Sequence, residues 1–125
     1  MTVTRIRASL NPTEDQLKVE KAIRNLFGEI EINHDSANST LHAEVVGHTS
    51  LYELKRKIAQ DRIRDTIRSV FTRWKENDRL SFGLNRQAAY AGHVSLNLQN
   101  EDPMGPIQVL ITGGVDEAVE FLCEK

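Results

Sequence analysis

The chain has only one cysteine, Cys123, so it has no internal disulfide. A lone thiol in an apolar pattern favours a reducing compartment and a packing role. The sequence also lacks any apolar run close to the roughly 20 residues that a membrane-spanning helix needs. Its N-terminus, Met1–Arg5, lacks the apolar core of a signal peptide. We therefore expect a cytoplasmic protein that has no membrane partner.

The usual sequence signals of catalysis and of metal or cofactor binding are missing too. There is no GxxxxGK[ST] loop, and Gly113-Gly114 is better explained by a tight turn between a strand and a helix. The four histidines stand at no zinc-ligand spacing, and no Ser/His/Asp order can be defended. The sequence predicts no enzyme, no catalytic residue, no cofactor, no metal and no small-molecule substrate.

Aromatic residues are scarce, at 6% of the chain. Tyr52, Phe71, Trp74 and Tyr90 mostly fit apolar stripes, so we expect them to be buried. Single-strand binders of the OB and RRM type need exposed rings on which bases stack. The pattern therefore argues against that class.

What the chain does have is the length of a single domain, residues 1–125, and a segregated charge. The segment from Ser50 to Lys75 carries eight basic and three acidic residues, whereas the remainder carries eight basic and 15 acidic ones. The net charge is −2. A local basic surface on an acidic protein suits a polyanion, although a solvated helix face has the same composition.

Hydrophobic periodicity predicts an α+β fold, an antiparallel-rich sheet with helices packed on one face. The expected order is β-α-β-β-α-β-β-β-α. The expected strands lie at 2–10, 29–33, 41–45, 80–84, 94–98 and 107–111, and the acidic loop at 100–106 precedes the last of them. The expected helices lie at 12–27, 50–75 and 115–122, with a helical turn at 85–89.

Capping residues suggest where the helices begin and end. The first helix starts either at Asn11, with Pro12 in its first position, or at Thr13. Gly28 is a natural stop for it. Ser50 and the glutamate three residues later form a capping box for the long helix. The stripe expected to be buried on the first helix comprises Val19, Ala22, Ile23, Leu26 and Phe27.

The helix expected at 50–75 has an apolar stripe that changes sides. Leu51, Leu54 and Ile58 lie within about 60° of one another, whereas the stripe that begins at Ile63 faces almost the opposite way. A continuous helix cannot bury both sides against one sheet. A kink, a terminal segment folded over the second side, or a homodimer interface through Leu51, Leu54 and Ile58 each explains the pattern.

The basic residues of this helix are ordered as well. Four of them fall within about 40° on the helical wheel: Lys57, Arg64, Arg68 and Lys75. Arg62 falls with Lys55 and Arg73 in a second row, and we keep it as a nearby candidate. Asp61 and Asp65 are placed to pair with Arg64 and Arg68 at i+3, which reduces the net field. The row therefore remains either a solvated face or a phosphate-binding face.

A polar cluster, Asn85-Arg86-Gln87, sits between two apolar strands. Such residues usually satisfy backbone groups at a turn. They also contact phosphates, sugars and base edges. We favour the structural role and keep Arg86 as a candidate for nucleic-acid binding.

Several motifs resemble one archaeal family, the uncharacterised protein family numbered two hundred and one. They are Pro12-Thr13-Glu14-Asp15, the Ser50-Leu51 start of the basic helix, Leu84-Asn85-Arg86-Gln87-Ala88-Ala89 and Gly105-Pro106-Ile107. The resemblance implies a fold similar to ribosomal protein L-five and a predicted RNA-binding role linked to the archaeal exosome. Some chains of the family are fused to a P-loop kinase-like domain, which this sequence lacks.

Together these features predict a non-catalytic RNA-binding or RNA-associated accessory protein, with structured RNA as its partner. The expected surface comprises Lys57, Arg62, Arg64, Arg68, Lys75 and Arg86. The alternative is a homodimeric protein–protein module without nucleic acid, joined through Leu51, Leu54 and Ile58 or through a sheet edge. A P-loop kinase-like enzyme is a candidate partner for that module.

Overall fold

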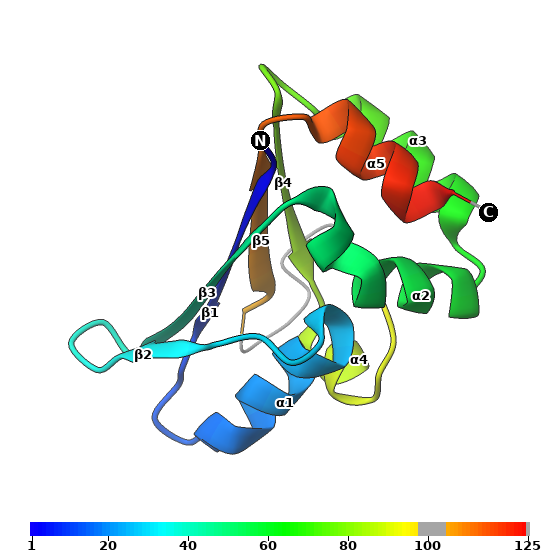
Figure 1. The fold of residues 1–125 in the computed structure, drawn as a ribbon. Coiled ribbons are helices and arrows are strands. Elements are labelled where there is room, and N and C mark those ends of the chain that lie inside the picture. Colours follow the sequence, from blue (N-terminus) through cyan, green and yellow to red (C-terminus); the bar gives the residue numbers. More distant parts are fainter. Residues whose placement is uncertain (98–104, 125) are drawn as a thin grey trace.

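A five-stranded antiparallel sheet forms one layer of the protein, and all the helices pack on one of its faces (Figure 1). This is a computed structural model, and it describes residues 1–97 and 105–124. The strands are β1 (Val3–Ser9), β2 (Asn33–Asp35), β3 (Thr40–Val46), β4 (Arg79–Leu84) and β5 (Ile107–Thr112). The helices are α1 (Gln16–Phe27), η1 (His48–Leu51), α2 (Tyr52–Gln60), α3 (Arg64–Trp74), α4 (Arg86–Tyr90) and α5 (Val115–Cys123). The expected α+β class with helices on one face is confirmed.

The strand order is β2-β3-β1-β5-β4, so the first strand of the chain is the central one. Ile6 of β1 lies opposite Ala43 of β3 and Val109 of β5, and all three are buried. Their sequence neighbours alternate to the other face, where Arg5 and Arg7 are exposed. The period-two alternation thus gives the sheet one apolar face and one polar face.

The core lies between the apolar face and the helices. On α1 the buried residues are those expected: Val19, Ala22, Ile23, Leu26 and Phe27. Gly28 ends this helix with a φ of 83°, a left-handed conformation that glycine adopts without steric cost. On the facing strands the buried residues include Ile6, Ala8, Leu41, Leu80, Phe82, Leu84, Ile107, Val109 and Ile111.

The single helix expected at 50–75 is wrong, because the chain forms α2 and α3 with a break at residues 61–63. Arg62 takes a left-handed conformation, with a φ of 57°, and this ends the helical hydrogen-bond ladder. The break lies where the apolar stripe changes sides. Helix α5 packs against both α2 and α3. The kink and the covering terminal segment therefore both explain the apolar pattern.

The prediction of a homodimer interface through Leu51, Leu54 and Ile58 is not supported by the structure, because the three side chains are buried within one copy of the chain. These side chains are 0%, 1% and 0% exposed within a single copy of the chain. They belong to the core, so they offer no surface to a second copy. The alternative that used these three residues loses its motivation, whereas a homodimer through a sheet edge stays a prediction.

The helix starts also differ from the expected ones. Asp15, rather than Asn11 or Thr13, caps α1, because its side chain accepts a hydrogen bond from the Leu17 amide. Ser50 caps nothing. It lies in the 3-10 turn η1 and its hydroxyl donates to the Gly47 carbonyl. The Asn11 side chain donates to the Glu14 carboxylate instead.

Two expected strands are displaced or absent. The strand expected at 29–33 forms instead at β2, Asn33–Asp35. Of the one expected at 94–98, residues 94–97 form only an isolated bridge between Leu96 and Leu84, and residue 98 lies outside the described residues. Most of the acidic loop expected at 100–106 also falls outside them. The helical turn expected at 85–89 is confirmed by α4, with Asn85 as its cap.

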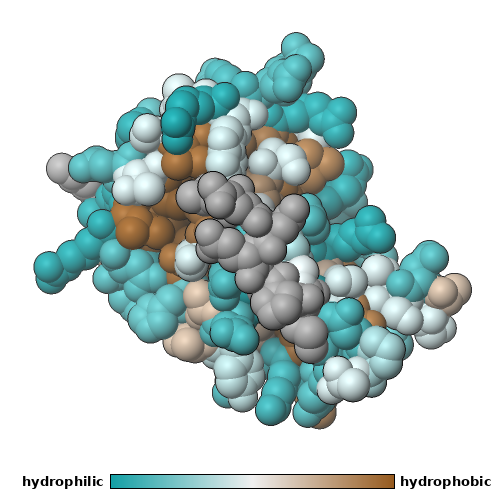
Figure 2. Space-filling view, turned by 180° about the vertical axis from the view of Figure 1, so that it is seen from behind, coloured by the Kyte–Doolittle hydropathy of each residue, from teal (hydrophilic) through white to brown (hydrophobic). Residues whose placement is uncertain are grey.

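No helix in the described part of the chain is long and apolar enough to cross a membrane. Seen from behind, the surface is mostly hydrophilic, and apolar residues gather in one region at the upper left (Figure 2).

Candidate functional site

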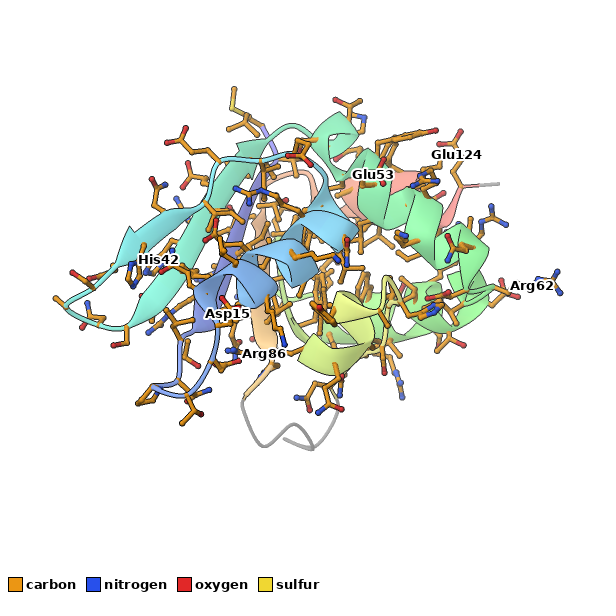
Figure 3. The ribbon with its side chains drawn as sticks, turned by 90° about the horizontal axis from the view of Figure 1, so that it is seen from below. Asp15, His42, Glu53, Arg62, Arg86 and Glu124 are labelled. Carbon is orange, nitrogen blue, oxygen red and sulfur yellow. The ribbon has the colours of Figure 1, made fainter. Side chains whose placement is uncertain are left out.

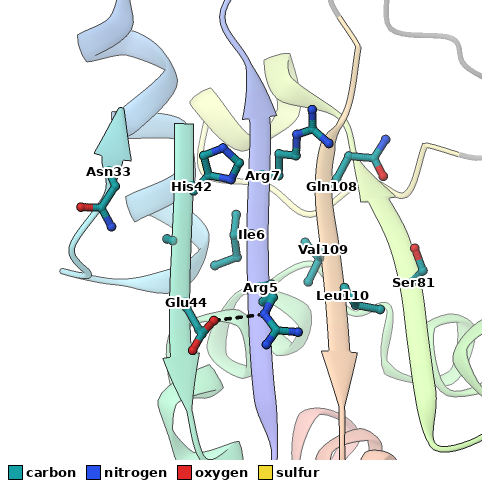
Figure 4. Close-up of a pocket in the computed structure, with 11 residues that line it drawn as sticks. Arg5, Ile6, Arg7, Asn33, His42, Glu44, Ser81, Gln108, Val109 and Leu110 are labelled. Carbon is teal, nitrogen blue, oxygen red and sulfur yellow. Dashed lines mark hydrogen bonds and ion pairs between the residues drawn. The ribbon is translucent and has the colours of Figure 1, made fainter. Parts of the chain in front are cut away.

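The face of the sheet that no helix covers is polar and mainly basic. Along β1, β3, β4 and β5 it carries three arginines and one carboxylate: Arg5, Arg7, Arg79 and Glu44. The other polar side chains on this face include those of His42, Ser81, Gln108 and Thr112. Figure 4 shows Arg5, Arg7, His42, Glu44, Ser81 and Gln108 on the neighbouring strands of this face. We call this surface the open face.

Two of the three arginines on the open face lack a partner among the described residues. Arg5 Nε lies 3.0 Å from Glu44 Oε2, in an exposed pair that contributes at most about 1 kcal/mol. No described residue forms an ion pair or a side-chain hydrogen bond with Arg7 or Arg79. Because both guanidinium groups are exposed on the same face, they are available to an anion.

A shallow concavity of about 450 Å³ lies over the middle of this face. Its polar lining includes Arg5, Arg7, Asn33, His42 and Gln108 (Figure 4). The His42 ring nitrogen Nε2 lies 2.7 Å from the Thr40 hydroxyl, which orients the ring. The lining has one carboxylate, that of Glu44, against the two arginines, so it supplies hydrogen-bond donors and a net positive charge, which are suited to phosphate or sugar oxygens.

The basic row expected on the long helix does not form a continuous positive surface. Arg68 forms an ion pair with Glu120, and Lys75 forms one with Asp116. The hydrogen bond with Glu120 raises the pKa of Arg68 further. Both acids belong to α5, so the helix that covers α3 neutralises this part of the row.

The remaining cations of the row lie around the break between α2 and α3. Arg62 points away from the body of the protein (Figure 3). Neither Lys57, Arg62 nor Arg64 forms an ion pair with a described residue, and Arg64 Nε is buried without a hydrogen-bond acceptor. The prediction that Asp61 forms an ion pair with Arg64 is wrong.

Asp61 instead ties the end of α2 to the segment after α4. Its carboxylate lies 2.9 Å from His93 Nδ1 and accepts a hydrogen bond of 2.8 Å from the Val94 amide. Burial acts to raise the pKa of Asp61, but these hydrogen bonds outweigh burial and bring the pKa below its ordinary value. Likewise, Asp65 does not pair with Arg68, which binds Glu120 instead.

Arg86 is buried, so the structure does not place it on a nucleic-acid surface. Its Nη1 donates to both carboxylate oxygens of Glu14 at 2.9 Å, and its Nε donates to the Gly105 carbonyl at 2.6 Å. The side chains of Arg86 and Glu14 are only 7% and 12% exposed. The structural role favoured for this cluster is observed for Asn85, which caps α4, and for Arg86, which Figure 3 shows directed inward.

The aromatic side chains are less buried than their spacing predicts. Phe71 is buried, but Tyr52, Trp74 and Tyr90 are 57%, 37% and 44% exposed. Tyr52 and Tyr90 belong to the helical layer, whereas Trp74 lines a surface depression together with Arg79 and Ser81. The scarcity of aromatic residues therefore does not exclude an exposed ring beside the open face.

The His, Cys, Asp and Glu side chains of the described residues bear on metal binding and on thiol chemistry. No group of three or more His, Cys, Asp or Glu side chains there is placed to hold a metal ion. Cys123 is buried, and burial raises the pKa of its thiol, which fits the expected packing role.

Sequence reasoning missed the open face as a site, although its signal was present. The alternation of β1 already places Arg5 and Arg7 together on the face opposite Ile6. The missing information was which face the helices leave uncovered along β4 and β5. That depends on the strand order, which local periodicity does not specify.

Comparisons with known proteins agree with the resemblance. A family model described as RNA binding matches residues 4–112. A UPF0201 protein of Sulfurisphaera tokodaii is 36% identical over 114 residues, covering 89% of this chain and 79% of that protein. One from Pyrobaculum aerophilum is 36% identical over 118 residues, covering 90% and 82%.

Solved structures show the same fold. The crystal structure of the UPF0201 protein from Methanococcus jannaschii superposes with a TM-score of 0.80 and 28% identity, covering 96% of this chain and 95% of that one. A second UPF0201 crystal structure gives a TM-score of 0.83 at 24% identity and covers 98% and 94%. By sequence over most of its length, this chain belongs to the UPF0201 family of archaeal proteins.

Proposed function

We propose that this protein is a non-catalytic RNA-binding or RNA-associated protein, and that it holds the RNA backbone on the open face of the sheet. The observation that carries the proposal is the presence of two exposed arginines, Arg7 and Arg79, that have no ion-pair partner among the described residues. The RNA-binding description of the matching family model supports the choice of polyanion. A cytoplasmic location belongs to the same proposal.

The charge distribution favours the open face over the helical layer. The whole chain carries a net charge of −2, yet the open face along β1, β3, β4 and β5 has three arginines and one glutamate. In the helical layer, by contrast, α5 places Asp116 and Glu120 against Lys75 and Arg68. A phosphate would meet less repulsion on the sheet.

The cations around the α2–α3 break form a second candidate surface. Lys57 and Arg64 belong to the row expected from the sequence, Arg62 was expected near it, and no described acid pairs with any of the three. Arg62 sits at a left-handed position, so glycine there removes the charge without adding backbone strain. The double variant Arg62→Gly with Arg64→Gln therefore tests this surface separately.

The test is binding to a labelled RNA hairpin with a 12-nucleotide single-stranded tail, measured by fluorescence anisotropy across a salt series. Each phosphate neutralised contributes about −0.7 to −0.9 to the slope of log K against log salt. Arg7→Gln with Arg79→Gln should therefore weaken binding and make the slope shallower by about 1.4 to 1.8. The substitutions lie on exposed positions and should leave the fold intact.

The matched control is Lys18→Gln, which removes an exposed cation from α1 on the helical side. It should change neither affinity nor slope. A wild-type protein that binds no RNA at low salt contradicts the function. Binding that is unaffected by the double sheet variant but lost with Arg62→Gly and Arg64→Gln moves the site to the α2–α3 break.

A further inference from the structure

Trp74 stands at the edge of the open face, although it belongs to the helical layer. It is the last residue of α3, and β4 is an edge strand of the sheet. Its indole lines one surface depression with Arg79, Ser81 and Leu110, and a second with Gly83, Pro106 and Gln108. The side chain thus lies beside β4 between two hollows, with 37% of its surface exposed.

The surroundings hold Trp74 and Arg79 in a fixed relation. One turn before Trp74, the buried ring of Phe71 packs on Phe82 of β4, with ring centroids 4.5 Å apart. After it, Glu76 and Arg79 exchange two backbone hydrogen bonds of 2.9 Å and close a tight turn. An exposed aromatic ring on such a rigid base binds another ring at little entropic cost.

This combination of groups fits an unpaired base. Single-stranded nucleic acid is bound by aromatic side chains on which bases stack, together with cations that follow the backbone. The Glu76 carboxylate lines the same depression and would repel a phosphate placed directly on the indole. Arg79 lines this depression too and offers its guanidinium to a phosphate beside the ring, and Arg7 lies further along the open face.

We infer that Trp74 is a stacking platform for one unpaired base of single-stranded RNA, whose backbone crosses the open face past Arg79 toward Arg7. The inference rests on the proposed function and names the form of RNA that this face selects. From strand spacing, Arg7 and Arg79 are separated by about 10 Å across the sheet and about 14 Å along it. One phosphate cannot reach both, so the face takes a run of several nucleotides.

The protein contains one tryptophan, so its fluorescence reports on this position alone. The probes are a 12-nucleotide single-stranded RNA, the same sequence as a blunt duplex, and a 12-residue abasic ribose-phosphate chain. Single-stranded RNA should quench the fluorescence of Trp74 with the same Kd as that measured by anisotropy. The abasic chain should bind without comparable quenching, because it has no base to stack.

Trp74→Leu should weaken binding of the single strand by about 5- to 150-fold, which is the range for losing one stacked base. Trp74→Phe should retain part of the affinity. Neither change should alter the salt slope, since no phosphate contact is lost. Tyr52→Leu is the matched control, because it removes an exposed ring from the helical layer.

The outcomes separate this inference from the function on which it rests. Equal affinity of Trp74→Leu and the wild type, or equal binding of duplex and single strand without quenching, overturns the stacking role while leaving phosphate binding by the open face in place. Failure of the wild type to bind any of the three probes overturns both.

Discussion

Arg86 illustrates, at the scale of a single residue, how a cation that suits nucleic acid serves the fold instead. Its guanidinium joins the end of β1, the segment before α1 and the segment before β5 through Ser9, Glu14 and Gly105. The planar guanidinium directs Nη1 to Glu14, Nη2 to Ser9 and Nε to Gly105, and the single nitrogen of a lysine cannot reproduce this set of three directions. The sequence predicted a structural role for Arg86. It did not identify Glu14 as the partner, because Glu14 is remote from Arg86 in the sequence.

We predict that Arg86→Gln lowers the free energy of unfolding by about 3–5 kcal/mol, because it leaves the Glu14 carboxylate buried without a counter-charge. Arg86→Lys should lower the free energy of unfolding by a smaller amount. Replacing both partners, with Arg86→Met and Glu14→Leu, should recover much of the loss. Urea denaturation measures all three, and a loss under 1 kcal/mol for Arg86→Gln would be incompatible with this role.

At the scale of elements, the turn before β4 fixes the start of α5. Gly114 begins that helix without a capping side chain of its own. Asp78 supplies the missing acceptor, since its carboxylate takes hydrogen bonds from the amides of Gly114 and Val115 at 3.0 and 2.9 Å. These bonds hold the pKa of Asp78 below its ordinary value of 3.8. Asp78 thereby helps to keep α5 in place over α2 and α3.

The lowered pKa gives the stability a defined pH dependence. The contribution of Asp78 is fully present above the pKa of the unfolded chain, near 3.8, and is lost as the pH falls through the lower pKa of the folded state. Asp78→Asn should therefore lower the Tm at pH 7, and the difference from wild type should shrink below about pH 4. A Tm difference that stays the same from pH 7 to pH 3 would exclude the ionic cap.

The elements also show what local sequence patterns can and cannot predict. Alternation located β1, β3, β4 and β5, and the 3.6-residue period located α1, because each buries one face against the same core. The change of sides in the apolar stripe between Ile58 and Ile63 indicated a kink as one explanation, and the chain does break there. Hydrophobic spacing did not identify Arg62 as the left-handed residue, because backbone conformation leaves no mark in it. Helical spacing assigned Trp74 to a buried stripe. Its exposure was missed because it results from the position of Trp74 beside an edge strand, and local spacing does not specify the strand order.

At the scale of the whole molecule, a two-layer α+β fold leaves one sheet face without a cover. The helices use their acids to neutralise their own bases, whereas the uncovered face keeps two arginines that have no partner among the described residues. An acidic chain thus retains a basic surface on the side opposite its helices. We therefore propose that RNA binds the open face of the sheet, and that the helices support the sheet from its other side.

The most direct test of that placement is an NMR titration of the ¹⁵N-labelled protein with the 12-nucleotide single-stranded RNA. The account predicts that amide shifts change along β1, β4 and β5, that the Trp74 indole N–H signal moves, and that α1 and α4 stay unchanged. Shifts confined to the α2–α3 break around Arg62 and Arg64, with the sheet unaffected, would contradict it.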